Sequence, residues 1–414
     1  MESGACVRDR RSRVQFAGDG VRFRTVARVA GIRVIESRVA FRVAWGSPPQ
    51  VRRATDDPGV AVAARCILIE TSREDYHSRV VAEALRQRGH RVVCLDGREF
   101  PGQAEVAYDY ADGALDVHLH TRDGDFHGAQ FDTVWHRRAQ APTIPACVAA
   151  PDRPFVGREA SRALRSLAHL LPQAFWVNRP DAARIANLKP WQLREAQRAG
   201  LRIARTFIGN APERVRAFLE AHPGAIYKPL AGEIWEEGGR EYATYTAEAS
   251  LDALPGDALL RAAPGIYQER VTKQYEVRAQ FFGATCLAVR IDARRVEYGD
   301  FDWRLNQRAG GLETAPIRLP PELHERCVRL LGALGLVAGG FDFIVTPEGD
   351  WVFLEVNEAG QFLFLEEWCA ELPVLDACCA FLASGDPRFL YAPPARPLHF
   401  AAVREHAAGE LAPS

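Results

Sequence analysis

The 414-residue sequence lacks several features that would assign it to a special class of protein. Its nine cysteines include no Cys-x-x-Cys pair, which argues against a zinc motif or a disulfide framework. It has no run of about 18 apolar residues, so no membrane-spanning helix is expected. It also lacks the short apolar segment of a secretory signal, and we therefore expect a cytoplasmic protein. The formal net charge of −1 gives no reason to expect nucleic acid or membrane as a partner.

Lysine is almost absent. Among the 52 basic residues, only Lys189, Lys228 and Lys273 are lysine. Lysine binds phosphate through a compact ammonium group, and the planar guanidinium of arginine does not simply replace it. The three retained lysines are therefore candidates for phosphate binding. Lys189 is expected at a helix N-terminus, where the helix dipole favours a bound anion. Lys228 is expected within an apolar strand, where a charge needs an anionic partner. Chance retention of the three lysines is the alternative.

The length allows two or three domains. Residues 1–62 are rich in arginine, and we interpret them as a poorly ordered extension or as sequence upstream of the true start. Binding of a polyanion is the alternative. Residues 63–175 begin with a strand at 64–70, a helix reaching about residue 88, and a strand at 91–95, which predicts an α/β unit. No Gly-x-Gly-x-x-Gly motif is present, so dinucleotide binding is unsupported.

The rest of the chain is divided by pattern into two mixed segments, 176–270 and 271–390, and a Pro- and Ala-rich tail at 391–414. The chain as a whole is therefore predicted to be α/β. The principal predicted elements are helices at 155–171, 187–200, 211–221, 321–336 and 362–383, and strands at 202–207, 225–230, 265–271, 275–282 and 284–291.

A predicted β-hairpin at 339–361 carries the strongest chemical signal. Two runs of β-branched and aromatic residues flank Pro347-Glu348-Gly349-Asp350, which has the composition of a turn. Pairing Thr346 with Trp351 places Phe343 opposite Leu354 and Asp342 opposite Glu355, with Asn357 on the same face as Glu355. Asp342, Glu355 and Asn357 together form an all-oxygen ligand set that suits Mg²⁺. A solvated hairpin face is the alternative.

Other polar residues mark further candidate positions. The predicted strand 275–282 places Glu276, Arg278 and Gln280 on one face. A glycine-bearing loop at 231–240 has a composition that could close over phosphates or could be a plain mobile loop. Arg137 and Arg138 follow an aromatic residue at a strand end. They could bind an acidic peptide or a phosphate, and a surface ion-pair cluster is the alternative.

Residues 64–385 resemble the ATP-grasp ligases. More narrowly, they are similar to the microviridin-type ribosomal peptide maturases, also called graspetide synthetases. The Glu-x-Asn hairpin is typical of the superfamily, whereas the other motifs point to the subfamily. These motifs are Val134-Trp135-His136-Arg137-Arg138, Asn178-Arg179-Pro180, Lys189-Pro190-Trp191-Gln192-Leu193, Asp302-Trp303-Arg304 and Glu355-Val356-Asn357-Glu358-Ala359-Gly360-Gln361. The resemblance implies an α/β ATP-grasp fold, with an N-terminal pre-ATP-grasp domain and two α+β lobes that clamp ATP.

The resemblance also implies site roles. ATP and Mg²⁺ are the expected cofactors, and Asp342, Glu355 and Asn357 would hold the metal. Arg278 and Arg304 would neutralise the transferring phosphoryl group or an acyl phosphate. Arg137, Arg138 and Asp302 are the candidate peptide-binding residues. The expected ATP-binding residues are Lys189 and Lys228 on the phosphates, Gln268, Glu269, Arg270 and Val271 against adenine, and Glu276 on the ribose.

The implied reaction converts an Asp or Glu side chain of a precursor peptide into an acyl phosphate. A Thr, Ser or Lys side chain of the same peptide then displaces phosphate, which gives a lactone or lactam ring. The expected partner is such a precursor with a leader and a core, and we also expect a homo-oligomer in the form of a dimer. One alternative is an ATP-grasp ligase that adds a free amino acid to a peptide or small acid. Another is a nucleotide-gated peptide-binding module without turnover.

Overall fold

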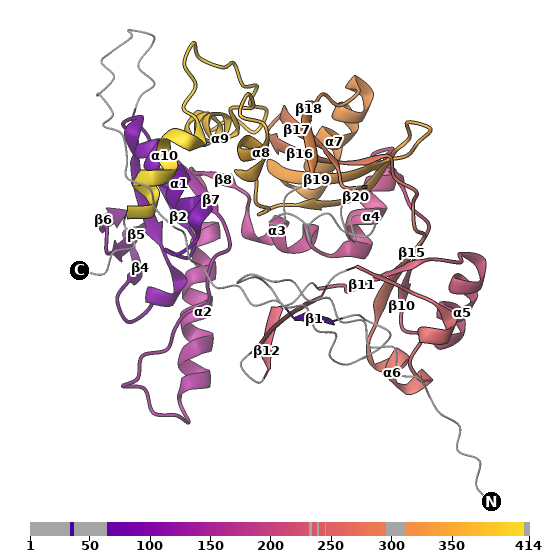
Figure 1. Ribbon diagram of the computed structural model, residues 1–414. Helices are drawn as coiled ribbons and strands as arrows, with labels where there is room; N and C mark the ends of the chain where they lie inside the picture. The colour runs from indigo at the N-terminus through magenta and orange to yellow at the C-terminus, as the bar shows by residue number, and fades with distance from the viewer. Residues whose placement is uncertain are drawn as a thin grey trace, which may run out of the picture. The chain divides into compact units, whose positions relative to one another are not determined.

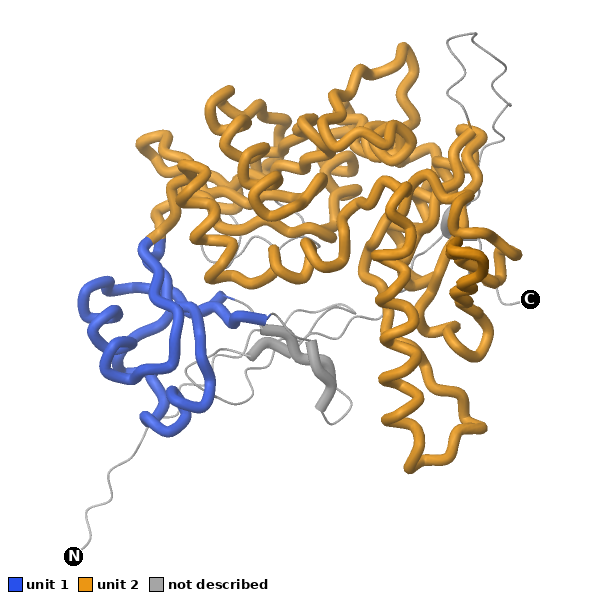
Figure 2. Tube along the Cα trace, turned by 180° about the vertical axis from the view of Figure 1, so that it is seen from behind, with its two compact units in different colours: residues 1–57, 205–270 blue, residues 58–204, 271–414 orange. Residues whose placement is uncertain are grey.

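The computed structural model describes residues 34–36, 64–231, 234–237, 240–244, 246–294 and 312–409. The chain divides into two compact units, shown in Figure 2. One unit consists of residues 1–57 and 205–270, and the other of residues 58–204 and 271–414. Helices and strands are mixed in both, so the predicted α/β class is confirmed. No helix in these described ranges is long and apolar enough to cross a bilayer.

The larger unit begins with a parallel sheet in the order β3-β2-β7-β8. Its first strand, helix and second strand are those predicted from the sequence. Helix α1 begins after Asp75, whose side chain accepts a hydrogen bond from the backbone N–H of Ser78. The elements are β2 (Cys66–Glu70), α1 (Tyr76–Gln87), β3 (Arg91–Leu95), β7 (Thr133–His136), α2 (Arg153–Leu170) and β8 (Phe175–Val177).

A three-stranded antiparallel sheet is inserted between β3 and β7. It consists of β4 (Glu105–Ala111), β5 (Ala114–Thr121) and β6 (Gly124–His127). Its apolar face joins a core that includes Leu68, Val93 and Leu167. Two short 3₁₀ helices flank this sheet, η1 (Gly97–Glu99) and η2 (Gly128–Gln130).

A six-stranded sheet in the order β18-β17-β16-β19-β20-β9 forms the second half of the larger unit. Successive side chains of β16 point to opposite faces of the sheet. Val277, Ala279 and Phe281 join the core that also holds α4 and α7 residues, so Arg278 points to the opposite face. The elements are α3 (Pro180–Ala186), α4 (Lys189–Arg198), β9 (Arg202–Ile203), β16 (Tyr275–Phe282), β17 (Thr285–Asp292), β18 (Glu313–Ile317), α7 (Pro321–Leu334), β19 (Ala338–Val345) and β20 (Trp351–Asn357).

Three C-terminal helices complete the larger unit, α8 (Phe364–Trp368), α9 (Val374–Ser384) and α10 (Phe400–Gly409). The prediction of one helix over 362–383 was wrong, because Pro373 caps a separate helix and has no N–H to continue the preceding one. Helix α10 packs against α1 (Figure 1), and its Phe400 and Val403 are buried in the same core as α1 and α9.

The smaller unit contains a four-stranded antiparallel sheet in the order β10-β15-β11-β14. The predicted strand at 202–207 is wrong as a single element, because β9 and β10 belong to different sheets on either side of Ala204 and Arg205. The sheet consists of β10 (Thr206–Gly209), β11 (Ile226–Lys228), β14 (Ala247–Glu248) and β15 (Gly265–Gln268), with α5 (Pro212–Ala221), η3 (Leu251–Ala253) and α6 (Asp257–Ala262). A second sheet pairs β1 (Val34–Glu36), β13 (Arg240–Thr244) and β12 (Ile234–Glu237).

Candidate functional site

The hairpin of β19 and β20 places Asp342 directly opposite Glu355, as predicted. The register nearer the turn differs from the prediction, because Phe343 pairs with Phe353 and Val345 pairs with Trp351. A β-bulge beside Asp342 takes up the one-residue difference. The two carboxylates therefore share one face although half of the expected register is shifted.

Asp342, Glu355 and Asn357 form one cluster of oxygen-bearing side chains. The Asn357 amide nitrogen donates hydrogen bonds to Asp342 Oδ2 at 3.1 Å and to Glu355 Oε1 at 3.2 Å. Two facing carboxylates repel each other unless positive charge or donors lie close by. The amide bridges the pair and fixes the spacing between them.

Two cationic side chains complete this cluster. Lys189 Nζ lies 2.5 Å from Glu355 Oε2, and Arg278 Nη1 lies 2.7 Å from Asp342 Oδ2. Arg278 stands opposite Asp342 in the β16–β19 register. Two positive and two negative groups thus meet at the open face of the sheet, and Lys189 is at the first residue of α4, as predicted.

Gln192 fixes the position of β20 relative to α4. Its side chain is fully buried and donates to the carbonyls of Ala186 and Val356 at 2.8 Å and 2.9 Å. Its Oε1 accepts from the Val356 N–H at 3.0 Å. Because Val356 lies between Glu355 and Asn357, this clamp positions both metal-ligand candidates. Gln192 was part of a quoted motif, but no role was assigned to it from the sequence.

Asn178 makes a similar clamp at the open end of the hairpin, where β19 begins and β20 ends. Its Oδ1 accepts from the backbone N–H groups of Val337 and Ala338 at 2.7 Å and 3.1 Å. Its Nδ2 donates to the carbonyls of Ala338 and Glu358 at 2.9 Å and 3.2 Å. This buried amide ties the start of β19 to the segment after β20, so the Asn-Arg-Pro motif has a structural basis.

Two glycines leave room for the Arg278 guanidinium. A Cβ at Gly340 would lie 2.6 Å from Arg278 Nη2, and a Cβ at Gly360 would meet the same atom. Arg278 Nη2 also donates to the Gln361 carbonyl at 3.2 Å. A side chain at either glycine would therefore displace the guanidinium from Asp342.

The same face of β16 carries two more buried polar residues. Glu276 forms an ion pair with Lys273, whose side chain is only 6% exposed. Gln280 is buried opposite Gly340. Lys273 was noted for its rarity without a role, and its rarity was the signal that could have placed it at this site.

Arg137 is 1% exposed, so it does not lie at the surface where we expected it to bind a peptide. Its Nε donates to Asp75 at 3.0 Å, and its Nη1 donates to the carbonyls of Ala359 and Gly360, both at 3.2 Å. Burial lowers the pKa of Arg137, whereas the Asp75 carboxylate opposes that shift. Arg137 thus holds the segment that follows the metal-ligand candidates. Arg138 is about half exposed.

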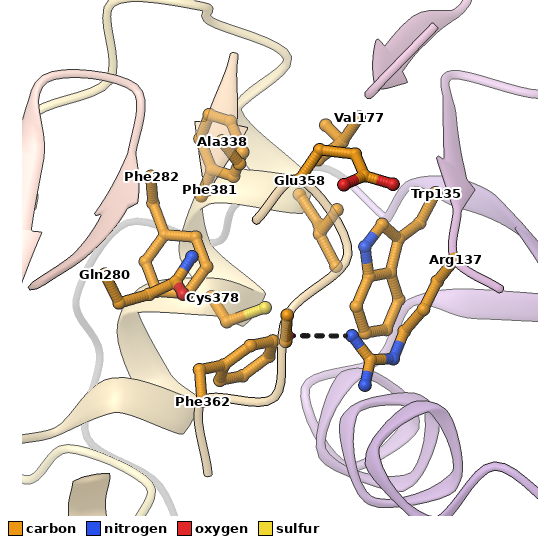
Figure 3. Close-up of a pocket in the computed structure, with 12 residues that line it drawn as sticks. Trp135, Arg137, Val177, Gln280, Phe282, Ala338, Glu358, Phe362, Cys378 and Phe381 are labelled. Atoms are coloured by element: carbon orange, nitrogen blue, oxygen red, sulfur yellow. Dashed lines mark hydrogen bonds between the residues drawn. The ribbon is translucent and has the colours of Figure 1, made fainter. Parts of the chain in front are cut away.

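A small cavity of about 20 Å³ lies beside Arg137. Figure 3 shows Arg137 and Trp135 on one side of it and Gln280, Phe362 and Cys378 on the other. The volume suits one water molecule. The space is too small for a nucleotide.

The smaller unit holds the other predicted ATP-binding residues. Lys228 Nζ donates to Gln268 Oε1 at 2.8 Å, and Gln268 Nε2 donates to Thr206 Oγ1 at 2.9 Å. Glu269 is bonded through its backbone N–H to the Arg205 carbonyl at 2.8 Å. Arg270 is exposed, and Val271 begins the return to the larger unit. Arg304 and Asp302 lie outside the described residues.

The residues present fit a magnesium ion. The donor set of Asp342, Glu355 and Asn357 is entirely oxygen, which is the chemistry Mg²⁺ prefers. Asn357 points its Nδ2 at both carboxylates, and a rotation of its amide would present Oδ1 instead. Lys189 and Arg278 each pair with one of the two carboxylates, so two cationic side chains stand beside the metal-ligand candidates, where an anionic ligand could meet them.

The chain is similar to a known family in its N-terminal part and to solved structures over most of its length. Residues 66–184 match the MvdD pre-ATP grasp domain. No curated protein sequence matches the chain significantly.

Among solved structures, a RiPP-associated ATP-grasp ligase from Chryseobacterium gregarium, in complex with ADP and a leader and core peptide, is 25% identical. It has a TM-score of 0.71 and covers 79% of this chain and 100% of its own. The macrocyclase MdnB from Microcystis aeruginosa MRC is 26% identical over 77% of this chain and 99% of its own, with a TM-score of 0.64. The ATP-grasp ligase PsnB, complexed with a phosphomimetic variant of its minimal precursor, Mg and ADP, is 25% identical over 78% and 99%, with a TM-score of 0.58.

Proposed function

We propose that this chain, an ATP-grasp ligase with an MvdD-type pre-ATP-grasp domain, closes side-chain rings in a ribosomally made precursor peptide. ATP and Mg²⁺ are its cofactors, and it is an ADP-forming carboxylate–amine or carboxylate–alcohol ligase. An Asp or Glu side chain of the peptide is activated as an acyl phosphate. A Thr, Ser or Lys side chain of the same peptide then forms the ester or amide.

The observation that carries this proposal is the cluster of Asp342, Glu355, Asn357, Lys189 and Arg278 on one face of the hairpin sheet. Such a cluster is suited to binding a metal–phosphate complex and is of little use for binding a peptide alone. Support for a peptide substrate comes from the relatives, one of which is complexed with a leader and core peptide.

We assign the site roles as follows. Asp342, Glu355 and Asn357 hold Mg²⁺, which when bound neutralises charge on the phosphate oxygens. Lys189 and Lys228 bind ATP phosphates, and Glu276 binds the ribose hydroxyls with its orientation fixed by Lys273. The adenine contacts are assigned to Gln268, Glu269, Arg270 and Val271.

The chemistry depends on positioned charge and on no enzyme nucleophile. A peptide carboxylate oxygen attacks the γ-phosphorus, and ADP leaves. Arg278, helped by Arg304, stabilises negative charge on the moving phosphoryl group and then on the acyl phosphate. The peptide hydroxyl or amine attacks the acyl carbon, loses its proton, and phosphate departs. Each ring therefore costs one ATP and removes one water from the peptide.

Arg278 is suited to this role because it is held without being fully neutralised. Its Nη1 is bound to Asp342, and among the described residues its Nη2 donates to the neutral carbonyl of Gln361. The fixed guanidinium supplies charge with little reorganisation. We further propose that Arg138 and Asp302 contact the peptide, that the enzyme acts in the cytoplasm, and that it forms a homodimer.

Intact mass spectrometry of the precursor tests the function directly. The precursor encoded beside this gene is co-expressed with the wild-type chain and, separately, with Asp342→Ala. We expect losses in steps of one water with the wild type and none with the variant. A mass gain would instead indicate addition of a free amino acid, and ADP release without loss of water would overturn ring closure.

A matched control separates a failed site from a failed fold. Asp350 lies on the same hairpin, is more than half exposed, and pairs with the exposed Arg202. Asp350→Ala should therefore retain ring formation. Light scattering after size-exclusion chromatography tests the proposed dimer, and a monomeric mass with full activity would contradict it.

A further inference from the structure

The small sheet of β4, β5 and β6 has two unlike faces. Val117, Leu119 and Phe126 are buried against the core of the N-terminal domain. Because side chains alternate along a strand, Asp116 and His118 point away from that core. The register places His118 directly opposite His127 on β6. The outer face of this sheet thus gathers residues that can ligate metal ions.

Asp116, His118 and His127 converge at one point on this face. One ligand atom from each residue lies within 4.8 Å of the others. His127 Nδ1 lies 3.0 Å from Asp116 Oδ2, and His118 Nε2 lies 3.8 Å from the same oxygen. The two imidazole rings are close neighbours, with centroids 4.1 Å apart. All three residues are exposed, and they lie on the paired strands β5 and β6.

We propose that Asp116, His118 and His127 bind a divalent transition-metal ion such as Zn²⁺. Two ligand atoms on a tetrahedral ion with bonds of about 2.1 Å stand roughly 3.4 Å apart. The observed 3.0 Å and 3.8 Å separations lie on either side of that value, so small side-chain rotations reach it. Three protein ligands leave one position for water or a further ligand.

The donor chemistry selects the class of ion. Two imidazoles and one carboxylate suit Zn²⁺, Co²⁺, Ni²⁺ or Cu²⁺, whereas Mg²⁺ prefers oxygen ligands alone. The site is therefore chemically distinct from the oxygen cluster around Asp342. It lies on a different sheet and does not depend on the proposed ring-closing function.

The surrounding charges favour a cation. Asp109 lies opposite Asp116 across the β4–β5 pair, and Glu105 lies opposite His120. His120 Nδ1 lies 2.8 Å from Asp125 Oδ1, and this pair is two residues along the strands from the His118–His127 pair. His120 is thus a histidine on the same face that is excluded from the cluster, and it provides a matched control.

The test is titration of the full chain with Zn²⁺ by calorimetry, in an Asp342→Ala background that removes the oxygen site. We expect His127→Ala to weaken one equivalent of Zn²⁺ at least about 10-fold, as losing a group from a metal centre does. The double variant D116N/H118A should lose that equivalent, whereas His120→Ala should keep it. These side chains are exposed, and circular dichroism checks that the variants fold.

Co²⁺ supplies a readout that a merely structural role would not change. Its d–d absorption should show nitrogen and oxygen ligation in the wild-type background and lose that signal in His127→Ala. Equal Zn²⁺ stoichiometry and affinity in the wild-type background and the D116N/H118A variant would overturn the proposal. An equal loss in His120→Ala would also overturn it, because binding would then be diffuse over the face.

Discussion

Arg278 lies directly opposite Asp342 across the β16–β19 pair, and its Nη1 donates to Asp342 Oδ2 at 2.7 Å. This ion pair is largely buried, and its guanidinium occupies space that side chains at Gly340 and Gly360 would fill. The position of the Arg278 charge, to which we assign a catalytic role, therefore depends on two residues that have no side chain.

Substitution of Gly340 by alanine should displace Arg278. The added Cβ would lie 2.6 Å from Nη2, closer than packing permits. We expect ring formation to slow by about 100-fold, since misplacing a charge by about 1 Å has that effect, and the protein to lose about 1–3 kcal/mol of stability. Single-turnover rates and denaturant melts measure the two effects.

Gly332 supplies the control for that substitution. It lies within α7, is exposed, and a Cβ there would meet no atom within 4 Å. Gly332→Ala should stabilise the protein by about 0.5–1 kcal/mol through helix propensity and leave the rate unchanged. If Gly340→Ala changes the rate and the stability no more than Gly332→Ala does, Gly340 is not needed to make room for Arg278.

Loss of the Gln192 clamp should affect both stability and activity. Gln192→Leu leaves the backbone groups of Val356 and the carbonyl of Ala186 without their buried partner. We expect a loss of about 3 kcal/mol in folding stability. We also expect weaker Mg²⁺-dependent ADP release, because Glu355 and Asn357 lie on either side of Val356. Exposed Gln197 on the same helix is the control, and Gln197→Leu should change neither quantity.

Arg137 and Arg138 should respond differently to substitution, although they are neighbours in the chain. Arg137→Gln removes the close ion pair of the largely buried Asp75, which keeps only the 4.0 Å contact with Arg138, and should lower the stability by about 3–5 kcal/mol. Arg138 is about half exposed, and Arg138→Gln should keep the stability while weakening binding of the leader peptide. Fluorescence anisotropy with a labelled leader measures the affinity. The affinities are compared at one temperature at which both variants are folded. An equal loss of peptide affinity in the two variants would contradict a peptide-binding role for Arg138 that Arg137 does not share.

The stability of the protein should fall in mild acid because of His77. Burial and the nearby Arg137 lower the pKa of His77 to about 3, and its Nε2 accepts from the backbone N–H groups of Phe362 and Leu363. The unfolded chain binds a proton at His77 below about pH 6.5, and the folded chain does so only near pH 3. Stability present above pH 6.5 is therefore lost as the pH falls.

Between pH 7 and pH 5 this loss should be about 2 kcal/mol. His77→Gln retains an acceptor without a titrating group, so denaturant melts of this variant should show a shallower pH dependence. His169→Gln, at an exposed position, should keep the wild-type slope. A His77→Gln slope equal to that of the wild type would show that His77 is not the group responsible.

The sequence predicts most of the hairpin site, and the remainder depends on three-dimensional contacts. Residue alternation and turn composition pair Asp342 with Glu355 correctly. The bulge beside Asp342 leaves no mark on that alternation, so the register of Phe343 was wrong. Gln192 and Asn178 lie in recognised motifs, but their backbone partners Val356 and Ala338 are more than 150 residues away along the chain.

Two other differences have the same origin. Two adjacent arginines, Arg137 and Arg138, suggest a surface position in the sequence. Only the packing of α1 and the segment after β20 reveals that Arg137 is buried. The stretch at 202–207 has uniform strand character, yet its two ends join different sheets. Neither glycine nor proline marks the crossing between them.

That crossing has a consequence for how the chain can be recombined. Residues 205–270 leave and rejoin the larger unit at neighbouring points, because Glu269 and Arg205 are joined by backbone and side-chain hydrogen bonds of 2.8 Å and 3.1 Å. A segment whose two ends meet can be exchanged as a cassette with only two junctions. Chimaeras made at 204/205 and 270/271 would exchange the proposed ATP contacts of Lys228 and Gln268 between ligases while the larger unit stays the same.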